Sequence, residues 1–371
     1  MRRFAYHFEP HTGWMNDPNG LVFFQGKYHA FFQHFPYDRC WGPMHWGHAV
    51  SEDLIHWQEL PVALTPNESY ENAGGCFSGS AVVKDDRLYL IYTSVSREFG
   101  QAQSVAWSDD GIHFTKYEDN PVLLADVDAE IHEDFRDPKV FPYGDAYRMV
   151  TGGFHNGRGR VLQFASEDLL HWEYMGVLYE SLEYHLPLEC PDLFPLGDKW
   201  VLMYSRIGRP EYAVQFIVGS YDGETFTPES YQTPEAGPQF YAPQSFEAED
   251  GRRLIMGWFY DWSKPPVTKG RSAGALTVPR ELWLDEFGML RSYPVREAWK
   301  LTRALRPCKE DQSTLPGIRI FADVDRVCVE EAAAGRRLEH FGNIQTVEVL
   351  EDVKGCEIYV NGGEVNFSVN L

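Results

Sequence analysis

Short apolar and aromatic runs fill the chain up to about residue 290, separated by turns rich in Gly, Asp, Asn and Pro. The run LVFF at 21–24, for example, directly follows the turn-forming stretch NDPNG at 16–20. Long segments in which apolar residues recur every three or four positions are absent from the sequence. The pattern therefore favours strands over helices and predicts an all-β protein.

Two phrases recur along this stretch at almost the same interval. SEDLIHW begins at residue 51, and similar phrases begin at residues 108, 166 and 220, which are 54 to 58 residues apart. An aromatic run, YHAFFQ at residue 28, recurs in step with it at residues 88, 147, 200 and 254. Each unit has room for about four short strands, so five units predict a five-bladed β-propeller. A β-solenoid is the main rival, although its repeats are generally shorter.

The pattern changes after the last repeat. We expect residues 1–293 to form the propeller and residues 294–304 to form a linker with a short helix. Residues 305–371 alternate apolar and polar positions, which predicts a shortened C-terminal β-sheet region, a reduced β-sandwich. Roughly 70 residues are too few for two five- or six-stranded sheets. Either a second copy covers an exposed apolar flank, giving a homodimer, or the flank is polar and the chain is a monomer.

Composition narrows the classes of partner. The net charge of −22, from 33 basic and 55 acidic residues, argues against nucleic acid and against a membrane surface. No signal peptide or transmembrane segment is evident, so we expect a cytoplasmic protein. The six cysteines show no paired spacing, and His45 and His48 lack a patterned third ligand. We therefore predict neither a metal nor another cofactor.

Acidic residues fall at corresponding places in three of the five units. Asp17-Pro18, Asp137-Pro138, Cys190-Pro191 and Ala242-Pro243 share one frame, at the strand that should line the central channel. Proline favours an extended conformation for the preceding residue, which gives those side chains defined directions. Glu189 lies one position earlier, so a β-bulge is needed to turn it toward the others. We expect Asp17, Asp137 and Glu189 to meet at one funnel.

Paired carboxylates beneath aromatic side chains are typical of glycosidic cleavage, in which one carboxyl protonates the leaving oxygen and the other attacks the anomeric carbon or activates water. Two ionised aspartates would raise the pKa of Glu189, and Arg136 would hold Asp137 charged. The ring, amide, hydroxyl and guanidinium groups expected beside the acids are those of Trp14, Asn16, Gln33, Trp41, Phe77, Ser78 and Arg136.

The motifs WMNDPNG, FRDP and ECPD, in this order and spacing, resemble the three signatures of glycoside hydrolase family 32, the invertase family. WGPMHWGH, FSGSAVV, FYAPQSF and GALTVPREL match as well, and the resemblance covers roughly residues 6 to 295. It implies a five-bladed propeller followed by a β-sandwich. It also implies a retaining β-fructofuranosidase that hydrolyses the terminal β-D-fructofuranosyl residue of sucrose, short fructo-oligosaccharides or sucrose 6-phosphate.

By this resemblance Asp17 is the nucleophile, Glu189 the acid and then the base, and Asp137 the residue that stabilises the transition state. The substrate-binding residues that it implies are Trp14, Asn16, Gln33, Trp41, Phe77, Ser78, Arg136, Tyr241 and Trp258. The sequence departs from the family at Gln239, which is commonly Asp, and in its short tail.

Other activities stay open on the sequence alone. A fructosyltransferase would use the same three acids, whereas a non-catalytic fructan-binding propeller would not need all of them. The preferred leaving group is also open. The arginines that could recognise a phosphate at the rim of the funnel are Arg158, Arg160, Arg206, Arg209 and Arg271.

Overall fold

The computed structural model describes residues 3–127, 131, 134–209, 211–264 and 270–371. This part of the chain is almost entirely β-structure, as predicted. Its helical elements are three short 3₁₀ helices, η1 Ser69–Glu71, η2 Ala125–Val127 and η3 Arg296–Leu301, the last within the predicted linker. No helix among these residues is long and apolar enough to cross a membrane.

Five sheets follow one another up to residue 294, each built from neighbouring antiparallel strands. Sheet 1 contains β1 Gly13–Phe24, β2 Lys27–Phe35, β3 His45–Ser51 and β4 Trp57–Leu64, with β19 Ser272–Ala273 parallel to β1. Sheet 2 contains β5 Gly75–Lys84, β6 Arg87–Ser96, β7 Gly100–Ser108 and β8 Thr115–Lys116. Sheet 3 contains β9 Asp134–Tyr143, β10 Ala146–His155, β11 Arg158–Ser166 and β12 Glu173–Glu180. Sheet 4 contains β13 Leu188–Leu196, β14 Lys199–Arg206, β15 Val214–Tyr221 and β16 Phe226–Gln232. Sheet 5 contains β17 Tyr241–Glu247, β18 Arg253–Trp258, β20 Arg280–Leu284 and β21 Leu290–Pro294.

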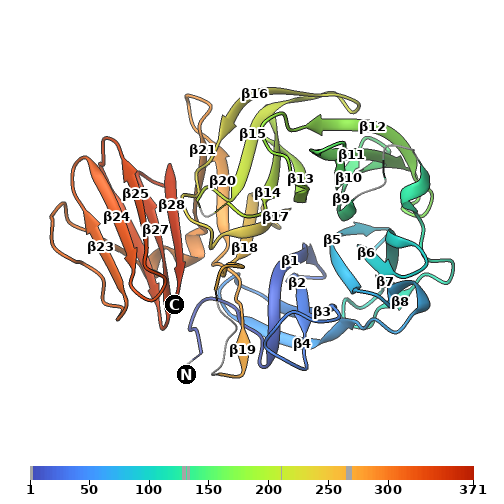
Figure 1. Cartoon of the computed structure of the whole chain (residues 1–371), viewed down its shortest axis with the longest axis horizontal. Coiled ribbons are helices and arrows are strands. Elements are labelled where there is room, and N and C mark those ends of the chain that lie inside the picture. Colours follow the sequence, from blue (N-terminus) through green and yellow to red (C-terminus); the bar gives the residue numbers. More distant parts are fainter. Residues whose placement is uncertain (1–2, 128–130, 132–133, 210, 265–269) are drawn as a thin grey trace.

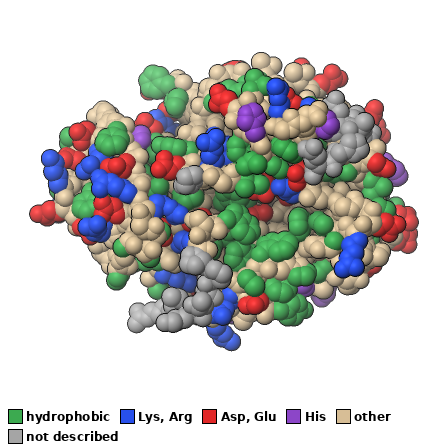
Figure 2. Space-filling model, viewed as in Figure 1, with side chains coloured by type: hydrophobic (Ala, Val, Ile, Leu, Met, Phe, Trp, Pro, Cys, Tyr) green, Lys and Arg blue, Asp and Glu red, His purple; other side chains and the backbone are tan. Residues whose placement is uncertain are grey.

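The first strands of the five sheets lie around a common centre (Figure 1). Strand β1 contacts β5, β5 contacts β9, β9 contacts β13, β13 contacts β17, and β17 returns to β1. These five strands, called the inner strands below, therefore form a closed cycle. Hydrophobic side chains gather over the centre of the ring in the space-filling view (Figure 2).

The two repeated phrases occupy equivalent places in the sheets. The aromatic runs are the second strands β2, β6, β10, β14 and β18. The SEDLIHW-like phrases form the turns between the third and fourth strands of sheets 1 to 4. In the first of these turns, the Asp53 carboxylate accepts hydrogen bonds from the backbone N–H groups of Ile55 and His56, at 3.0 and 2.7 Å. Asp110, Asp168 and Asp222 do the same in their own turns, which explains why this phrase recurs.

The tail folds into two smaller sheets at one side of the ring (Figure 1). One contains β22 Thr302–Ala304, β26 Val347–Asp352, β27 Gly355–Val360 and β28 Val365–Asn370. The other contains β23 Ile318–Ala322, β24 Arg326–Glu331 and β25 Arg336–Phe341. Buried side chains of both sheets, among them Ile320, Val329, Val349 and Ile358, form one hydrophobic cluster. The tail therefore contains two sheets that pack on each other.

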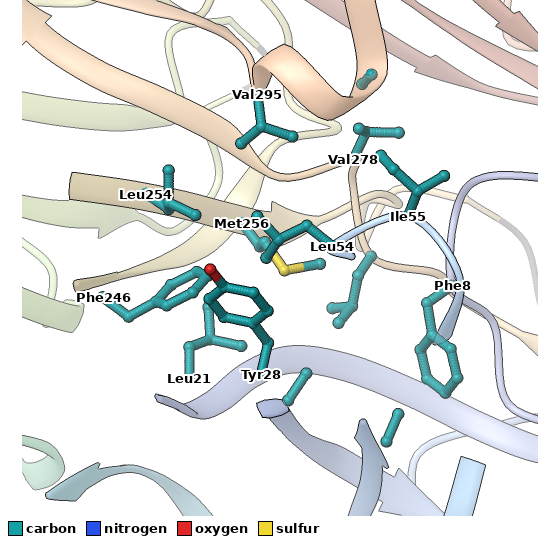
Figure 3. Packing of buried hydrophobic residues seen from close by; sticks show 14 of the residues in the cluster. Phe8, Leu21, Tyr28, Leu54, Ile55, Phe246, Leu254, Met256, Val278 and Val295 are labelled. Carbon is teal, nitrogen blue, oxygen red and sulfur yellow. The ribbon is translucent and has the colours of Figure 1, made fainter. Parts of the chain in front are cut away.

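A second cluster joins the tail to the ring. It contains Tyr28 of β2, Phe246 of β17 and Met256 of β18 together with Leu350 and Tyr359 of the tail, and Figure 3 shows its packing around Tyr28, Phe246 and Met256. Within this contact the buried His7 ring bonds to Asp352 at 3.0 Å and to Glu357 at 2.9 Å. Polar and apolar contacts therefore both hold the tail against the ring.

Candidate active site

All five inner strands carry the same irregularity near their N-terminal ends. Two consecutive residues of the inner strand lie opposite a single residue of the second strand, which is a β-bulge. A bulge bends the strand and redirects the side chains beside it. The bulged pairs are Asn16-Asp17, Phe77-Ser78, Asp137-Pro138, Cys190-Pro191 and Ala242-Pro243.

The bulges show that the three acids do not occupy the same position in their strands, in contrast to the alignment of residue–proline pairs that the sequence suggested. Asp17 is the second residue of its bulge and Asp137 is the first, while Glu189 directly precedes the bulge of β13. Asp17-Pro18 is therefore offset by one position from the other residue–proline pairs. The bulge required near Glu189 is present.

The expected extended conformation before proline is wrong for three of the four pairs. Asp137, Cys190 and Ala242 have φ values of 64°, 48° and 46°, which lie in the left-handed region. Each is the first residue of its bulge, and the surrounding strand pairing holds it there against its own preference. Such conformations cluster at functional sites because a rigid scaffold can impose an unusual side-chain direction.

Asp17 is held by two side chains. Its Oδ2 accepts a hydrogen bond from the Ser78 hydroxyl at 2.6 Å, and its Oδ1 accepts one from the Asn16 amide at 3.0 Å. The Trp14 indole N–H donates to the Asn16 Oδ1 at 2.8 Å, which fixes the orientation of that amide. Trp14, Asn16 and Ser78, which the sequence analysis placed beside the acids, thus all help to orient the Asp17 carboxylate.

Asp137 lies beside Asp17, with the Cys190 thiol as their shared neighbour. The Cys190 Sγ is 3.6 Å from Oδ2 of both aspartates, and the Cys190 backbone N–H donates to Asp137 Oδ2 at 2.9 Å. The backbone N–H of Asp137 donates to the Thr93 hydroxyl at 3.0 Å. Sequence reasoning missed Cys190 and Thr93 as site residues, although Cys190 already stood in the repeat frame.

Glu189 is held from two sides. Its Oε1 accepts a hydrogen bond from Arg136 Nη2 at 3.1 Å, and its Oε2 accepts one from the Tyr241 hydroxyl at 2.5 Å. The same guanidinium contacts Asp134 and lies 3.8 Å from Asp137. Arg136 is therefore shared among three carboxylates.

Burial raises the pKa of all three acids, because their charged forms lose hydration. For Asp137, burial together with the charges of Glu189 and Asp17 outweighs Arg136 and raises the pKa to about 7. Arg136 lowers the pKa of Asp137, as expected, but burial and the two neighbouring carboxylates raise it by more. Since the carboxyls interact, they release protons as a group, and the cluster retains a proton up to near-neutral pH.

The remaining residues expected at the site divide into two groups. Trp41 is half-exposed and meets the Phe77 ring edge-on at 5.9 Å, and the buried Gln33 amide donates to the Cys76 carbonyl at 2.9 Å. Trp258, in contrast, is fully buried, and its neighbours include the rings of Trp14, Tyr241 and Trp262. Other rings cover Trp258, and a contact between Trp258 and the sugar stays a prediction.

The half-exposed ring of this aromatic group belongs to Trp262, which sequence reasoning missed. Its ring centroid lies 5.6 Å from that of Trp14 and 4.9 Å from that of Trp258. Both tryptophans stand in the segment GWFYDW, and only burial distinguishes them.

Gln239 lies outside the acid cluster. Its amide N–H group donates to Asp261 at 3.0 Å and to Glu331 of β24 at 3.1 Å, and its carbonyl accepts the Asn370 backbone N–H. Gln239, which stands where the family commonly has Asp, therefore stabilises the contact between the ring and the tail.

The five inner strands converge on one small cavity, to which each contributes lining residues. Among these are Pro18, Ser78, Asp137, Pro191 and Pro243. No group of three or more potential metal ligands lies close enough to hold an ion, as far as the chain is described.

Known proteins similar to this chain are enzymes that act on fructosides. A sucrose-6-phosphate hydrolase of Zymomonas mobilis is 41% identical over 322 residues, which cover 79% of this chain and 62% of that enzyme. A raffinose invertase of Escherichia coli is 40% identical over 364 residues, covering 91% of this chain and 74% of that enzyme. This chain thus spans less than two thirds of the length of the Zymomonas relative.

Solved structures that are similar to this chain point in the same direction as the similar sequences. A β-fructofuranosidase of Bombyx mori, solved in complex with sucrose, has a TM-score of 0.87 and 32% identity, and the match covers 100% of this chain and 89% of that one. The family model of the glycosyl hydrolases family 32 N-terminal domain matches residues 7–294. The chain therefore belongs to glycosyl hydrolase family 32.

Proposed function

We propose that the protein is a retaining β-fructofuranosidase. It releases the terminal β-D-fructofuranosyl residue of sucrose, sucrose 6-phosphate or short fructo-oligosaccharides through a covalent fructosyl-enzyme. The observation that carries this proposal is the meeting of Asp17, Asp137 and Glu189 from three inner strands, with each carboxylate in a different hydrogen-bonding environment.

We infer that the ring of five sheets is a five-bladed β-propeller. Its catalytic domain extends over residues 1–293, residues 294–304 form the linker, and residues 305–371 form a reduced β-sandwich. The closed cycle of inner strands supports this assignment. Such a ring brings one strand end from every blade to the same axis, which is how residues far apart in the sequence can build one site.

In the first step Asp17 attacks the anomeric carbon of the fructosyl unit while Glu189 protonates the leaving oxygen. The bonds from Ser78 and Asn16 to Asp17 stabilise its ionised form and aim it. Burial favours the protonated form of Glu189, as a general acid requires. The glycosidic bond breaks, and the leaving sugar takes the proton.

In the second step Glu189, now ionised, takes a proton from water, and that water attacks the same carbon and frees Asp17. The Tyr241 hydroxyl and Arg136 stabilise the ionised Glu189 between the two steps. Asp137 binds hydroxyls of the fructosyl unit and stabilises its positive charge in the transition state. Asn16, Gln33, Trp41, Phe77, Ser78, Arg136, Trp14 and Tyr241 shape the pocket.

The test measures fructose release from sucrose, sucrose 6-phosphate, 1-kestose, inulin and levan. Asp17→Asn should abolish release from every substrate, because an amide cannot act as the nucleophile. Asp198→Asn is the matched control, since Asp198 lies in an exposed turn of sheet 4. Release by Asp17→Asn at the parent rate would disprove the assignment, and accumulation of longer fructosides at high sucrose would indicate a transferase.

A further inference from the structure

The start of β9, which carries Asp137, is fastened to sheet 2 by three side chains. The Thr93 hydroxyl of β6 accepts the backbone N–H of Asp137 at 3.0 Å. Two residues earlier, the Gln101 side-chain oxygen accepts the Phe135 N–H at 2.7 Å. The Gln103 amide donates to the Phe135 carbonyl at 3.0 Å. The backbone that leads into Asp137 therefore has fixed partners in the neighbouring sheet.

Gln103 also fixes the direction of the Thr93 hydroxyl. The two residues pair in the β6–β7 ladder, and the hydroxyl donates to the Gln103 side-chain oxygen at 2.8 Å. A hydroxyl has one proton to donate and two lone pairs that accept, so this bond leaves a lone pair for the Asp137 N–H. Both side chains are fully buried, and solvent therefore does not compete for these groups.

Asp137 needs this partner because of its backbone conformation. Its φ of 64° lies in the left-handed region, which is unfavourable for a residue with a side chain. Because Asp137 is the first residue of a bulge, its N–H lies outside the regular ladder of β9 and β10. A buried N–H without a partner is costly. The bond to Thr93 therefore stabilises the conformation that places the Asp137 carboxylate at the central cavity.

The left-handed residues in the bulges of β13 and β17 are anchored in the same way. The Ala242 N–H donates to the Ser205 hydroxyl at 2.9 Å, and the Cys190 N–H donates to the Asp137 carboxylate at 2.9 Å. In each case the left-handed N–H meets a side-chain oxygen of the preceding sheet. Asp137 receives one such bond and supplies the next, so a shift of its backbone would also move its carboxylate away from Cys190.

We propose that Thr93, oriented by Gln103, is a positioning residue that holds Asp137 for the reaction. This inference rests on the proposed function and deepens it, because it names the groups that place the acid which stabilises the transition state. Thr93 acts through Asp137: without the hydroxyl, the Asp137 N–H loses its partner and the left-handed conformation loses its anchor. A misplacement of about 1 Å in a catalytic group can cost about 100-fold in rate.

The test measures kcat/KM for sucrose and for β-D-fructofuranosyl fluoride in the parent and in Thr93→Val, which keeps the shape of the side chain but removes its hydroxyl. We expect kcat/KM to fall by about 10- to 100-fold. The loss should be equal for both substrates, because Asp137 acts on the fructosyl unit that they share. Thr93→Ser, which retains the hydroxyl, should keep most of the parent activity. Gln103→Met should lower kcat/KM for both substrates, but by less than Thr93→Val, because the hydroxyl is still present.

Thr151→Val is the matched control. Thr151 is fully buried and lies opposite the same bulge in β10, but its hydroxyl has no hydrogen-bond partner in the part of the chain that the structure describes. The same substitution there should leave kcat/KM unchanged. Circular dichroism and urea unfolding identify the folded variants, and Gln103→Met decides the question if Thr93→Val does not fold.

An unchanged kcat/KM in a folded Thr93→Val or Gln103→Met protein would overturn the inference. Losses in Thr93→Ser or Thr151→Val as large as in Thr93→Val would overturn it too, because the bond to Asp137 would then not be the cause. A loss confined to sucrose would assign the effect to protonation of the leaving group by Glu189 and so refute the role of Thr93. If the parent acts on neither substrate, the proposed function itself fails, whereas an active parent with an equally active Thr93→Val refutes only this inference.

Discussion

Replacing Arg280 by Met should uncouple the tail from the ring. Arg280 is fully buried, and its guanidinium bonds to Glu235 at 2.6 Å, to Glu357 at 2.8 Å and to the Ser368 hydroxyl at 2.7 Å. Its flat group also lies 4.6 Å from the Phe240 ring centre. One side chain of β20 therefore joins sheet 5 to strands β27 and β28 of the tail.

The expected loss of unfolding free energy depends on the carboxylates that Arg280→Met leaves without a charged partner. Glu357 keeps its bonds from His7, Tyr359 and the Val278 N–H, whereas Glu235 keeps only the Ser368 hydroxyl among the side chains that the structure describes. Removing one partner of a buried ion pair costs about 3–5 kcal/mol of unfolding free energy, because a carboxylate is left uncompensated. At about 2 °C per kcal/mol for a chain of this size, the melting temperature should fall by roughly 6–10 °C.

The assay is thermal or urea unfolding of Arg280→Met followed by tryptophan fluorescence. Arg337→Met is the control, since Arg337 is half-exposed and pairs with Glu330 and Glu339, and its loss should leave the unfolding free energy nearly unchanged. Adding Glu235→Gln to Arg280→Met should recover part of the loss, because the uncompensated carboxylate is then gone. An Arg280→Met protein as stable as its parent would refute this reasoning.

Three further predictions follow from the site and the tail. Because the pKa of Asp137 is raised to about 7 in the folded state, from the ordinary value near 4, the stability of the fold decreases as the pH rises from about 4 to about 7, and the loss is complete above that range. Asp137→Asn should therefore be inactive, but its unfolding free energy at pH 8 should exceed that of the parent by up to about 4 kcal/mol. This gain should vanish toward pH 4, and urea unfolding at the two pH values measures it. Tyr241→Phe removes a hydrogen bond that lowers the pKa of Glu189. The alkaline limb of the pH profile of kcat/KM should therefore move to higher pH, and kcat should fall. An alkaline limb at the parent's pH would contradict this prediction. Finally, sedimentation at micromolar concentration distinguishes a homodimer from a monomer, because a fully active 42.7 kDa species that is unchanged on dilution would rule out the dimer.

Much of the fold could be predicted from the sequence because local chemistry enforces it. An aspartate that caps a turn, as Asp53 does, recurs wherever that turn recurs, and a second strand buried on both faces, such as β2, is mostly apolar or aromatic. The convergence of Asp17, Asp137 and Glu189 followed from placing these markers on one repeat. No single motif would have given it.

The details that escaped prediction depend on pairing between strands. A bulge exists only relative to the partner strand, so the left-handed conformation of Asp137 and the offset of Asp17 could not be read from the residue–proline pairs alone. Trp258 and Trp262 are the same residue type four positions apart, and only packing decides which ring is covered. Arg136 adjoins Asp137 in the sequence, but the fold brings Glu189 closer to its guanidinium.

The covalent step on Asp17 is the central claim, and one measurement tests it most directly. Glu189→Gln, incubated with β-D-fructofuranosyl fluoride, should form the fructosyl-enzyme, because fluoride leaves without protonation, and should then accumulate it for lack of the base. Intact-mass and peptide analysis should find one added fructosyl unit on the peptide that contains Asp17. Turnover of the fluoride without any adduct, or an adduct on another residue, would contradict the account.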